Sequence, residues 1–226
     1  MTKIIEMCDL EKSYGYGRNK IEVLRGINLD INRGDVVSIT GPSGTGKSTL
    51  LNMMGCLDNF DSGRLILSGR DVSRFSVDEL SQFRNSHVGF IFQLHNLLPE
   101  FTAIENVMIP LLIRRVASKD AKAMSYEMLQ KFNMEDRADH KPGEMSGGEC
   151  QRIAAARAIV GEPDLILADE PTGSLDSKNS MALLEIFLGL CKDKGSTIVV
   201  VTHDPRIADM THRKIQMLDG VIVNEL

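Results

Sequence analysis

A glycine-rich segment between a predicted strand and a predicted helix constrains the fold of this chain more than any other feature. Residues 41–49 fit the pattern G-x-x-x-x-G-K-[ST], and they follow a short apolar run at residues 35–40 that predicts a strand. Glycines here permit backbone angles at which successive N–H groups converge on an anion, and a helix beginning near Gly46 adds the positive end of its dipole. Lys47 supplies a charge for the outer phosphates of a nucleotide, and the Ser48 hydroxyl supplies a Mg²⁺ ligand. A turn that binds nothing has no use for a Lys-Ser pair at its exit, so the sequence predicts nucleotide binding.

The composition is that of an ordinary globular protein and argues against nucleic acid as a partner. The 226 residues carry a net charge of −5 and the pI is about 5.6, so a basic surface for a DNA or RNA backbone is not expected. No signal peptide is expected, and no uncharged apolar run approaches the roughly 20 residues of a membrane-spanning helix. We therefore expect no direct membrane insertion. The scattered cysteines predict free thiols in a reducing cytoplasm: Cys8, Cys56, Cys150 and Cys191.

Strand and helix patterns divide the chain into a β-rich first third, a helical middle and two further buried strands. From about residue 105 to residue 160, apolar residues recur at helical spacing. Continuous apolar runs at 165–168 and 197–201 predict strands that are covered on both faces, as in a parallel sheet. We therefore expect an α/β fold with a helical lobe inserted into a strand-rich nucleotide-binding lobe. The earlier strands are predicted at 3–9, 22–31 and 64–68.

Two adjacent carboxylates end the predicted strand at 165–168. Ending a buried strand in paired acids is costly unless the acids face a cation. Because side chains alternate along a strand, Asp169 and Glu170 point in different directions. Asp169 suits a place in a Mg²⁺ shell, and Glu170 suits polarising a water that attacks the γ-phosphate. A solvated strand end is the alternative, which the nearby phosphate loop disfavours.

A second candidate anion site lies at the start of a predicted helix over 150–160. Ser146 and Glu149 have the spacing of a capping box, which alone would only begin a helix well. The two glycines between them, Gly147 and Gly148, each disfavour a helix by roughly 1 kcal/mol. They make more sense if a ligand approaches the backbone there.

Together these segments resemble the motifs of the ATPase subunit of ATP-binding-cassette (ABC) transporters, over essentially the whole chain. The two strong motifs are similar to Walker A and Walker B, and residues 145–149 resemble the signature motif. Weaker elements follow the family's order: Tyr14 resembles the A-loop aromatic, Gln93 the Q-loop glutamine, residues 174–176 the D-loop and His203 the switch histidine. The resemblance implies a P-loop NTPase fold of the ABC ATPase type. It would form a single domain over residues 1–226, with a β-rich N-terminal subdomain, a mainly parallel core sheet and a helical subdomain inserted at about 94–160.

The resemblance also implies roles for individual residues, with ATP and Mg²⁺ as ligands. The expected catalytic residues are Lys47, Gln93, Glu170 and His203. The expected Mg²⁺ ligands are Ser48, Gln93 and Asp169. Contacts to ATP are expected from Tyr14, Gly41, Pro42, Ser43, Gly44, Thr45, Gly46, Lys47, Ser48, Thr49, Ser146, Gly147, Gly148 and Asp176.

Two residues of the signature segment depart from the common family pattern. Met145 replaces the usual Leu, which is a conservative apolar exchange, and Glu149 replaces the usual Gln. A carboxylate that pointed toward the phosphates would weaken ATP binding. As the third helical residue, Glu149 could instead turn back to the cap.

A narrower resemblance links the chain to the lipoprotein-releasing (LolD-type) ATPases, whose relatives include MacB-type export and FtsE-type cell-division ATPases. The segments that carry it are 89–107, 146–149 and 168–176. It implies a head-to-tail dimer with a second copy of the chain, bound peripherally to membrane permease subunits on the cytoplasmic side of the inner membrane. The expected function is to power the release or export of lipoproteins or a related amphiphilic cargo. The alternatives are MacB-type efflux and FtsE-type regulation of a transmembrane partner, and a nucleic-acid ATPase is disfavoured by the acidic pI.

Apolar residues after Gln93 suggest where a permease could dock. Leu97, Leu98, Phe101 and Ile104 lie in a stretch interrupted by a proline, where we expect an exposed loop. The alternative is that these side chains only seat the helical lobe on the sheet.

Overall fold

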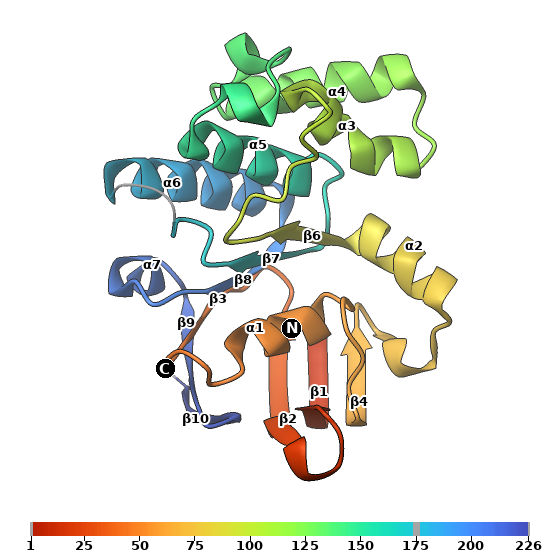
Figure 1. Cartoon of the computed structure of the whole chain (residues 1–226), viewed down its shortest axis with the longest axis vertical. Helices are drawn as coiled ribbons and strands as arrows, with labels where there is room; N and C mark the ends of the chain where they lie inside the picture. Colours follow the sequence, from red (N-terminus) through yellow and green to blue (C-terminus); the bar gives the residue numbers. More distant parts are fainter. Residues whose placement is uncertain (1, 174–176, 226) are drawn as a thin grey trace. The chain divides into compact units, whose positions relative to one another are not determined.

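The computed structural model describes residues 2–173 and 177–225, and the chain divides into two compact units. The first unit comprises Met1–Arg84 and Thr197–Leu226, and the second comprises Asn85–Ser196. Each unit has its own strands and helices (Figure 1).

An antiparallel sheet forms the N-terminal part of the first unit, with β1, β2 and β4 side by side (Figure 1). Side chains two residues apart on a strand project to the same side. Ile5 and Met7 of β1, with Leu65 and Leu67 of β4, are therefore buried together on one face. The strand order is β2-β1-β4-β5, and the bounds are β1 Lys3–Tyr14, β2 Ile21–Asn32, β4 Ser62–Leu67 and β5 Arg70–Asp71.

A mainly parallel sheet forms the rest of the first unit. β3 pairs in parallel with both β8 and β9, whereas β10 pairs antiparallel with β9. Every residue of β8 is buried, as its continuous apolar run predicts. The strands are β3 Val36–Thr40, β8 Thr197–Val201, β9 Arg213–Leu218 and β10 Val221–Glu225. The helical elements are α1 Lys47–Met54, α7 Pro205–Asp209 and the 3₁₀ turns Gly17–Asn19 and Val72–Arg74, and α2 Val77–His87 leads into the second unit.

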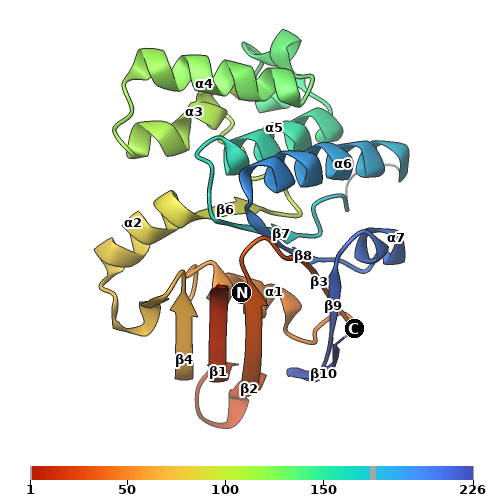
Figure 2. The ribbon, with the colours of Figure 1, turned by 180° about the vertical axis from the view of Figure 1, so that it is seen from behind.

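The second unit pairs β6 with β7 in parallel and adds a group of helices. Within it α3, α4 and α5 contact one another, and α6 lies beside α5 (Figure 2). Capping boxes explain two helix starts: Thr102 with Glu105 begins α3, and Ser146 with Glu149 begins α5. The bounds are β6 Val88–Ile91, β7 Leu165–Asp169, α3 Ala103–Ile113, α4 Ser118–Lys131, α5 Gly147–Ile159, α6 Ser177–Lys194 and the 3₁₀ turns Glu135–Arg137 and Pro142–Glu144.

The α/β class, the β-rich N-terminal part and the mainly parallel sheet are confirmed. The helix predicted from residue 150 begins at Gly147, because the Ser146 cap starts it despite two glycines. The strand and helix predictions do not include α2, β6 or α6. The bounds of an inserted helical subdomain at about 94–160 stay a prediction.

Candidate functional site

The phosphate loop connects β3 to α1 in the first unit, and its backbone requires glycine at two points. Gly41 has a φ of 146° and Gly46 a φ of 95°, both in the region that favours glycine. A Cβ on Gly41 would lie 2.2 Å from the Met217 carbonyl oxygen, and one on Gly46 would lie 2.8 Å from the Val23 carbonyl oxygen. The loop therefore packs its own backbone against neighbouring strands, which fixes its path.

The N-terminus of α1 suits a phosphate group. Gly46 is the N-cap residue and has no side chain that could accept a hydrogen bond from the helix. Its side of the helix start therefore leaves the first backbone N–H groups available to an anion. The Lys47 ammonium donates hydrogen bonds to two carbonyl oxygens of the loop, that of Gly41 at 2.9 Å and that of Pro42 at 2.8 Å. The Thr45 hydroxyl closes the loop by donating to the Pro42 carbonyl at 3.0 Å. The exposed residues of the segment are Pro42, Ser43, Gly44 and Ser48.

The register of the parallel sheet brings His203 to the same sheet edge as the phosphate loop. Ile39 of β3 is paired with Val201 of β8. Gly41 and His203 each come two residues later, at the carboxyl ends of adjacent parallel strands, where open α/β sheets bind ligands. His203 is exposed at this edge.

Tyr14 lies against the phosphate-loop helix of the same unit. Its hydroxyl donates to Asp58 Oδ2 at 2.8 Å, and the Thr49 side chain also interacts with it. Burial and the Asp58 carboxylate raise the pKa of Tyr14, against a smaller lowering by Thr49. The structure therefore brings Tyr14 close to Thr49 of the phosphate-loop segment, and the role of Tyr14 as the A-loop aromatic stays a prediction.

The second unit repeats the same register at β6 and β7. Ile91 is paired with Ala168, and Gln93 and Glu170 each follow two residues later at the carboxyl ends. Glu170 has a φ of 46°, an unusual angle for a residue other than glycine and a form of strain found at active sites. Its carbonyl accepts a hydrogen bond from the Gly173 amide at 3.0 Å. A Cβ on Gly173 would lie 3.5 Å from Gln93 Nε2, so the Gln93 side chain lies beside this turn.

Gln151 links α5 to the segments that follow β6 and β7. It is not among the site residues predicted from the sequence. It is fully buried in α5, and its Nε2 donates to the carbonyl oxygens of Phe92, at 3.1 Å, and Pro171, at 2.9 Å. These carbonyls flank Gln93 and Glu170. A polar residue on the apolar face of a predicted helix is the signal that could have found it.

The Glu149 carboxylate turns back to its own helix cap. Its Oε2 accepts from the Ser146 backbone N–H and hydroxyl, both at 2.8 Å, and its Oε1 accepts from Arg137 Nε at 2.8 Å. The Ser146 backbone bond, then Arg137, then the Ser146 hydroxyl lower the pKa of Glu149 to about 2. A Cβ on Gly147 would meet no other described atom within 4 Å. The described part of the chain therefore gives no steric reason for glycine there.

The expected Mg²⁺ ligands each occupy a loop or strand end. Ser48 is the second residue of α1, Gln93 follows β6 and Asp169 ends β7, half-buried. No group of three or more His, Cys, Asp or Glu side chains that could hold a metal forms among the residues that the structure describes. The assignment of these three residues to Mg²⁺ stays a prediction. Asp176 lies outside the described residues.

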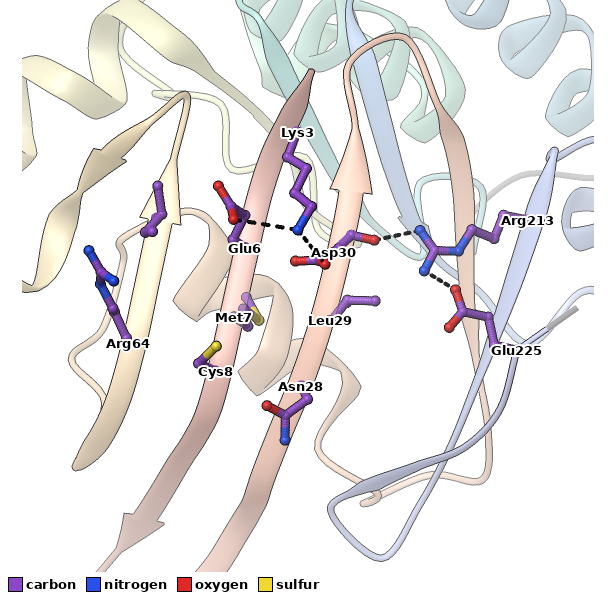
Figure 3. Close-up of a pocket in the computed structure, with 11 residues that line it drawn as sticks. Lys3, Glu6, Met7, Cys8, Asn28, Leu29, Asp30, Arg64, Arg213 and Glu225 are labelled. Carbon is purple, nitrogen blue, oxygen red and sulfur yellow. Dashed lines mark hydrogen bonds and ion pairs between the residues drawn. The ribbon is translucent and has the colours of Figure 1, made fainter. Parts of the chain in front are cut away.

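A hollow of about 450 Å³ lies over the solvent-facing side of β1, β2 and β4 (Figure 3). Lys3 lies between Asp30, at 2.7 Å, and Glu6, at 3.5 Å. Arg213 pairs with Glu225 and donates to the Asp30 carbonyl. These cations and anions neutralise one another, so the hollow is a poor phosphate site.

The apolar segment after Gln93 is only partly exposed. Leu97 and Ile104 are buried, at 8% and 5% exposure, so the prediction of an exposed position is wrong for both. Both belong to the hydrophobic core, and Ile104 is the second residue of α3. Leu98 and Phe101 are 44% and 42% exposed, as predicted. The buried Asn106 side chain fixes the loop, because it accepts from the Leu98 amide and donates to the carbonyls of Leu98 and Phe101.

None of the helices in the described ranges has the length and apolar character needed to cross a membrane. Cys8, Cys56 and Cys150 are free thiols, as predicted.

Comparison with known proteins gives one family. Residues 24–173 match the ABC transporter family. The "Lipoprotein-releasing system ATP-binding protein LolD" of Bacteroides fragilis is 51% identical over 97% of this chain and 100% of its own length. The "Uncharacterized ABC transporter ATP-binding protein YknY" of Bacillus subtilis is 46% identical over 97% of this chain and 95% of its own. A dimeric, post-hydrolysis structure of the ATP-binding cassette MJ0796 bound to ADP and Pi has a TM-score of 0.93 and 38% identity, covering 98% of this chain and 97% of that one. The chain belongs to the ABC transporter family.

Proposed function

We propose that this chain is the ATP-hydrolysing subunit of a transporter that releases lipoproteins through a separate membrane permease. The observation that carries the ATPase part is the phosphate loop, whose glycines adopt positive φ angles and whose helix follows Gly46, an N-cap residue with no side chain to cover the first N–H groups. In the whole chain we expect one ABC domain over residues 1–226, with a helical subdomain at about 94–160.

The proposed chemistry is attack of water on the γ-phosphorus of ATP, which breaks the bond to the bridging oxygen and yields ADP and phosphate. Glu170 accepts the proton of the attacking water, and Gln93 and His203 orient the water and the γ-phosphate. Lys47 stabilises the charge on the phosphate oxygens as the bond breaks. Ser48, Gln93 and Asp169 would hold Mg²⁺, which neutralises phosphate charge. Their positions at helix and strand ends support these roles.

We further propose that two copies act together, with the Ser146 helix start of one copy facing the ATP on the phosphate loop of the other. The open surroundings of the exposed Gly147 support this arrangement, since glycine there serves no described neighbour. The dimeric structure of the MJ0796 cassette supports it as well.

Lipoprotein release is supported by the printed names of several relatives, which are 48–51% identical to this chain over nearly its full length. The chain would bind its permease peripherally, on the cytoplasmic side of the membrane. Efflux of another cargo and regulation of a membrane partner without transport are the other outcomes of a functional test.

The test is reconstitution of the chain with the permease of its own cell in vesicles that contain acylated lipoprotein. We expect ATP-dependent release of the lipoprotein with the wild-type chain and none with Lys47→Ala. If the complex is intact on a sizing column and hydrolyses ATP without releasing lipoprotein, the proposal that lipoprotein is the cargo is refuted. The proposal that the chain is an ATPase is then still supported.

A further inference from the structure

A buried lysine lies directly behind Tyr14. Lys12 is only 7% exposed, and it precedes Tyr14 by two residues on β1, which places both side chains on one face of the strand. Its ammonium lies 3.0 Å from each Asp58 carboxylate oxygen, and the Asn59 carbonyl also accepts from it. A lysine this buried must be paired, and here the pairing group belongs to the loop after α1.

The same ammonium lies over the aromatic ring. Lys12 Nζ is 4.7 Å from the centre of the Tyr14 ring, within the range of a cation–π contact. Asp58 meanwhile accepts the Tyr14 hydroxyl at 2.8 Å. Burial alone would raise the pKa of Asp58, but the hydrogen bonds from Tyr14 and Lys12 outweigh it and leave that pKa below its ordinary value. Asp58 is therefore an anion at neutral pH that holds both partners.

These contacts leave one part of the ring uncovered. The lysine occupies one face and the carboxylate holds the hydroxyl, yet Tyr14 remains 42% exposed. Its hydroxyl also touches Thr49 in the phosphate-loop helix. The ring is thus held in place while Tyr14 stays partly exposed next to the loop.

We propose that Lys12 and Asp58 are positioning residues for the adenine of bound ATP, because together they hold the Tyr14 ring in the orientation that stacks on the base. This inference rests on the proposed ATP site and on Tyr14 as the residue that meets adenine. A ring already fixed loses little freedom on binding, so the base gains affinity at small entropic cost. The Lys12–Asp58 pair carries no net charge, so it acts on the base rather than on the phosphates.

The test compares two ligands that share phosphates but not the base: MgATP and inorganic tripolyphosphate with Mg²⁺. Dissociation constants are measured by calorimetry for wild type, Lys12→Met and Asp58→Asn, and KM and kcat are measured for the same variants. We expect the Kd and KM for ATP to rise about 5–10-fold, which corresponds to about 1–1.4 kcal/mol. The tripolyphosphate Kd and the kcat should stay within about twofold of wild type.

Lys3→Met is the matched control. Lys3 also lies on β1 and pairs with an aspartate, Asp30, at 2.7 Å, but in the hollow of Figure 3, so its removal should change neither Kd. The double variant Lys12→Met/Asp58→Asn leaves no unpaired buried charge and should lose ATP affinity like the single variants. Should any of these misfold, Tyr14→Phe keeps the ring, loses the contacts of the hydroxyl with Asp58 and Thr49 and should weaken ATP binding about two- to threefold.

Two results would overturn the inference. Equal loss of ATP and tripolyphosphate binding would mean that Lys12 supports the loop as a whole and not the base. Unchanged ATP binding in a folded Lys12→Met protein would remove it from the site. Tyr14→Ala separates failure of this inference from failure of the proposed adenine site. If Tyr14→Ala also leaves the ratio of the Kd for ATP to the Kd for tripolyphosphate unchanged, Tyr14 does not meet adenine.

Discussion

Replacing Glu149 by Gln, the residue usual at this position in the family, tests how the signature helix is capped. The carboxylate accepts two hydrogen bonds from Ser146 and one from Arg137, and an amide keeps the shape but loses the charge. We expect the Glu149→Gln protein to be less stable at neutral pH. Its ATPase turnover should stay within about twofold of wild type, because the carboxylate faces the cap and Arg137.

The magnitude follows from the pKa of Glu149, which lies at about 2 against an ordinary 4.5. Each tenfold change in an ionisation constant is worth about 1.4 kcal/mol, so full conversion would give about 3 kcal/mol. The Glu149 side chain is 25% exposed and that of Arg137 42%, so solvent screening reduces the effect and we expect about 1–2 kcal/mol. For a chain of this size that lowers the Tm by about 3–6 °C.

The sign of the pH dependence is fixed. A carboxylate with a lowered folded-state pKa stabilises the protein fully above its unfolded-state pKa, and this contribution is lost as the pH falls toward the folded-state value. The stability difference between wild type and Glu149→Gln should therefore be constant from pH 8 to about 5.5 and shrink below about 4.5. Urea unfolding of both proteins from pH 8 to the lowest pH at which they fold measures it.

A double-mutant cycle with Arg137→Met supplies the control. That change should destabilise the wild-type protein and have little effect in the Glu149→Gln background, because the charge pair is already gone. Additive effects, or a stability difference that does not change with pH, would refute this account of the cap.

Three further predictions concern catalysis and docking. Lys47→Ala should lower ATP turnover at least about 100-fold through lost charge stabilisation, and unchanged phosphate release by the purified protein would refute the site. Glu170→Gln should bind MgATP, stall hydrolysis and run as a dimer on a sizing column, whereas a persistent monomer would argue against paired cassettes. Leu98→Asp should abolish permease pull-down with little change in Tm, while Leu97→Asp, which buries a charge, should lower the stability by about 3 kcal/mol or more. Lost stability with retained pull-down in Leu98→Asp would remove that loop from the interface.

The sequence predicts the strands and loops that carry chemistry because hydrophobic runs and glycine patterns are local signals. The runs at 35–40, 165–168 and 197–201 become β3, β7 and β8, and parallel pairing alone then brings loop residues to one sheet edge within each unit.

Contacts between distant segments are not local signals, and the sequence leaves them open. Both the partner of Lys12 and the buried state of Gln151 depend on residues more than 15 positions away. Leu97 and Leu98 are adjacent and chemically identical, yet one is buried and the other exposed, and Asn106 fixes the loop by hydrogen bonds to both backbone groups of Leu98. The bond from Arg137 to Glu149 is likewise not a local signal, because the two residues are twelve positions apart, whereas the two bonds from Ser146 belong to the local capping box.

Mixing two inactive variants tests the central claim, that each ATP is used between two copies of this chain. Lys47→Ala removes the phosphate-loop charge and Ser146→Arg obstructs the facing helix start, so each alone should be inactive. A mixed dimer then has one site with both defects and one with neither. If that intact site can hydrolyse ATP alone, random pairing of equal amounts of the two variants predicts about a quarter of wild-type ATPase activity. About half of the dimers are then mixed, and each mixed dimer has one intact site of two. Continued inactivity, with mixed dimers shown to form, would contradict the claim that one complete shared site suffices. Full activity of Ser146→Arg alone would contradict the shared site itself.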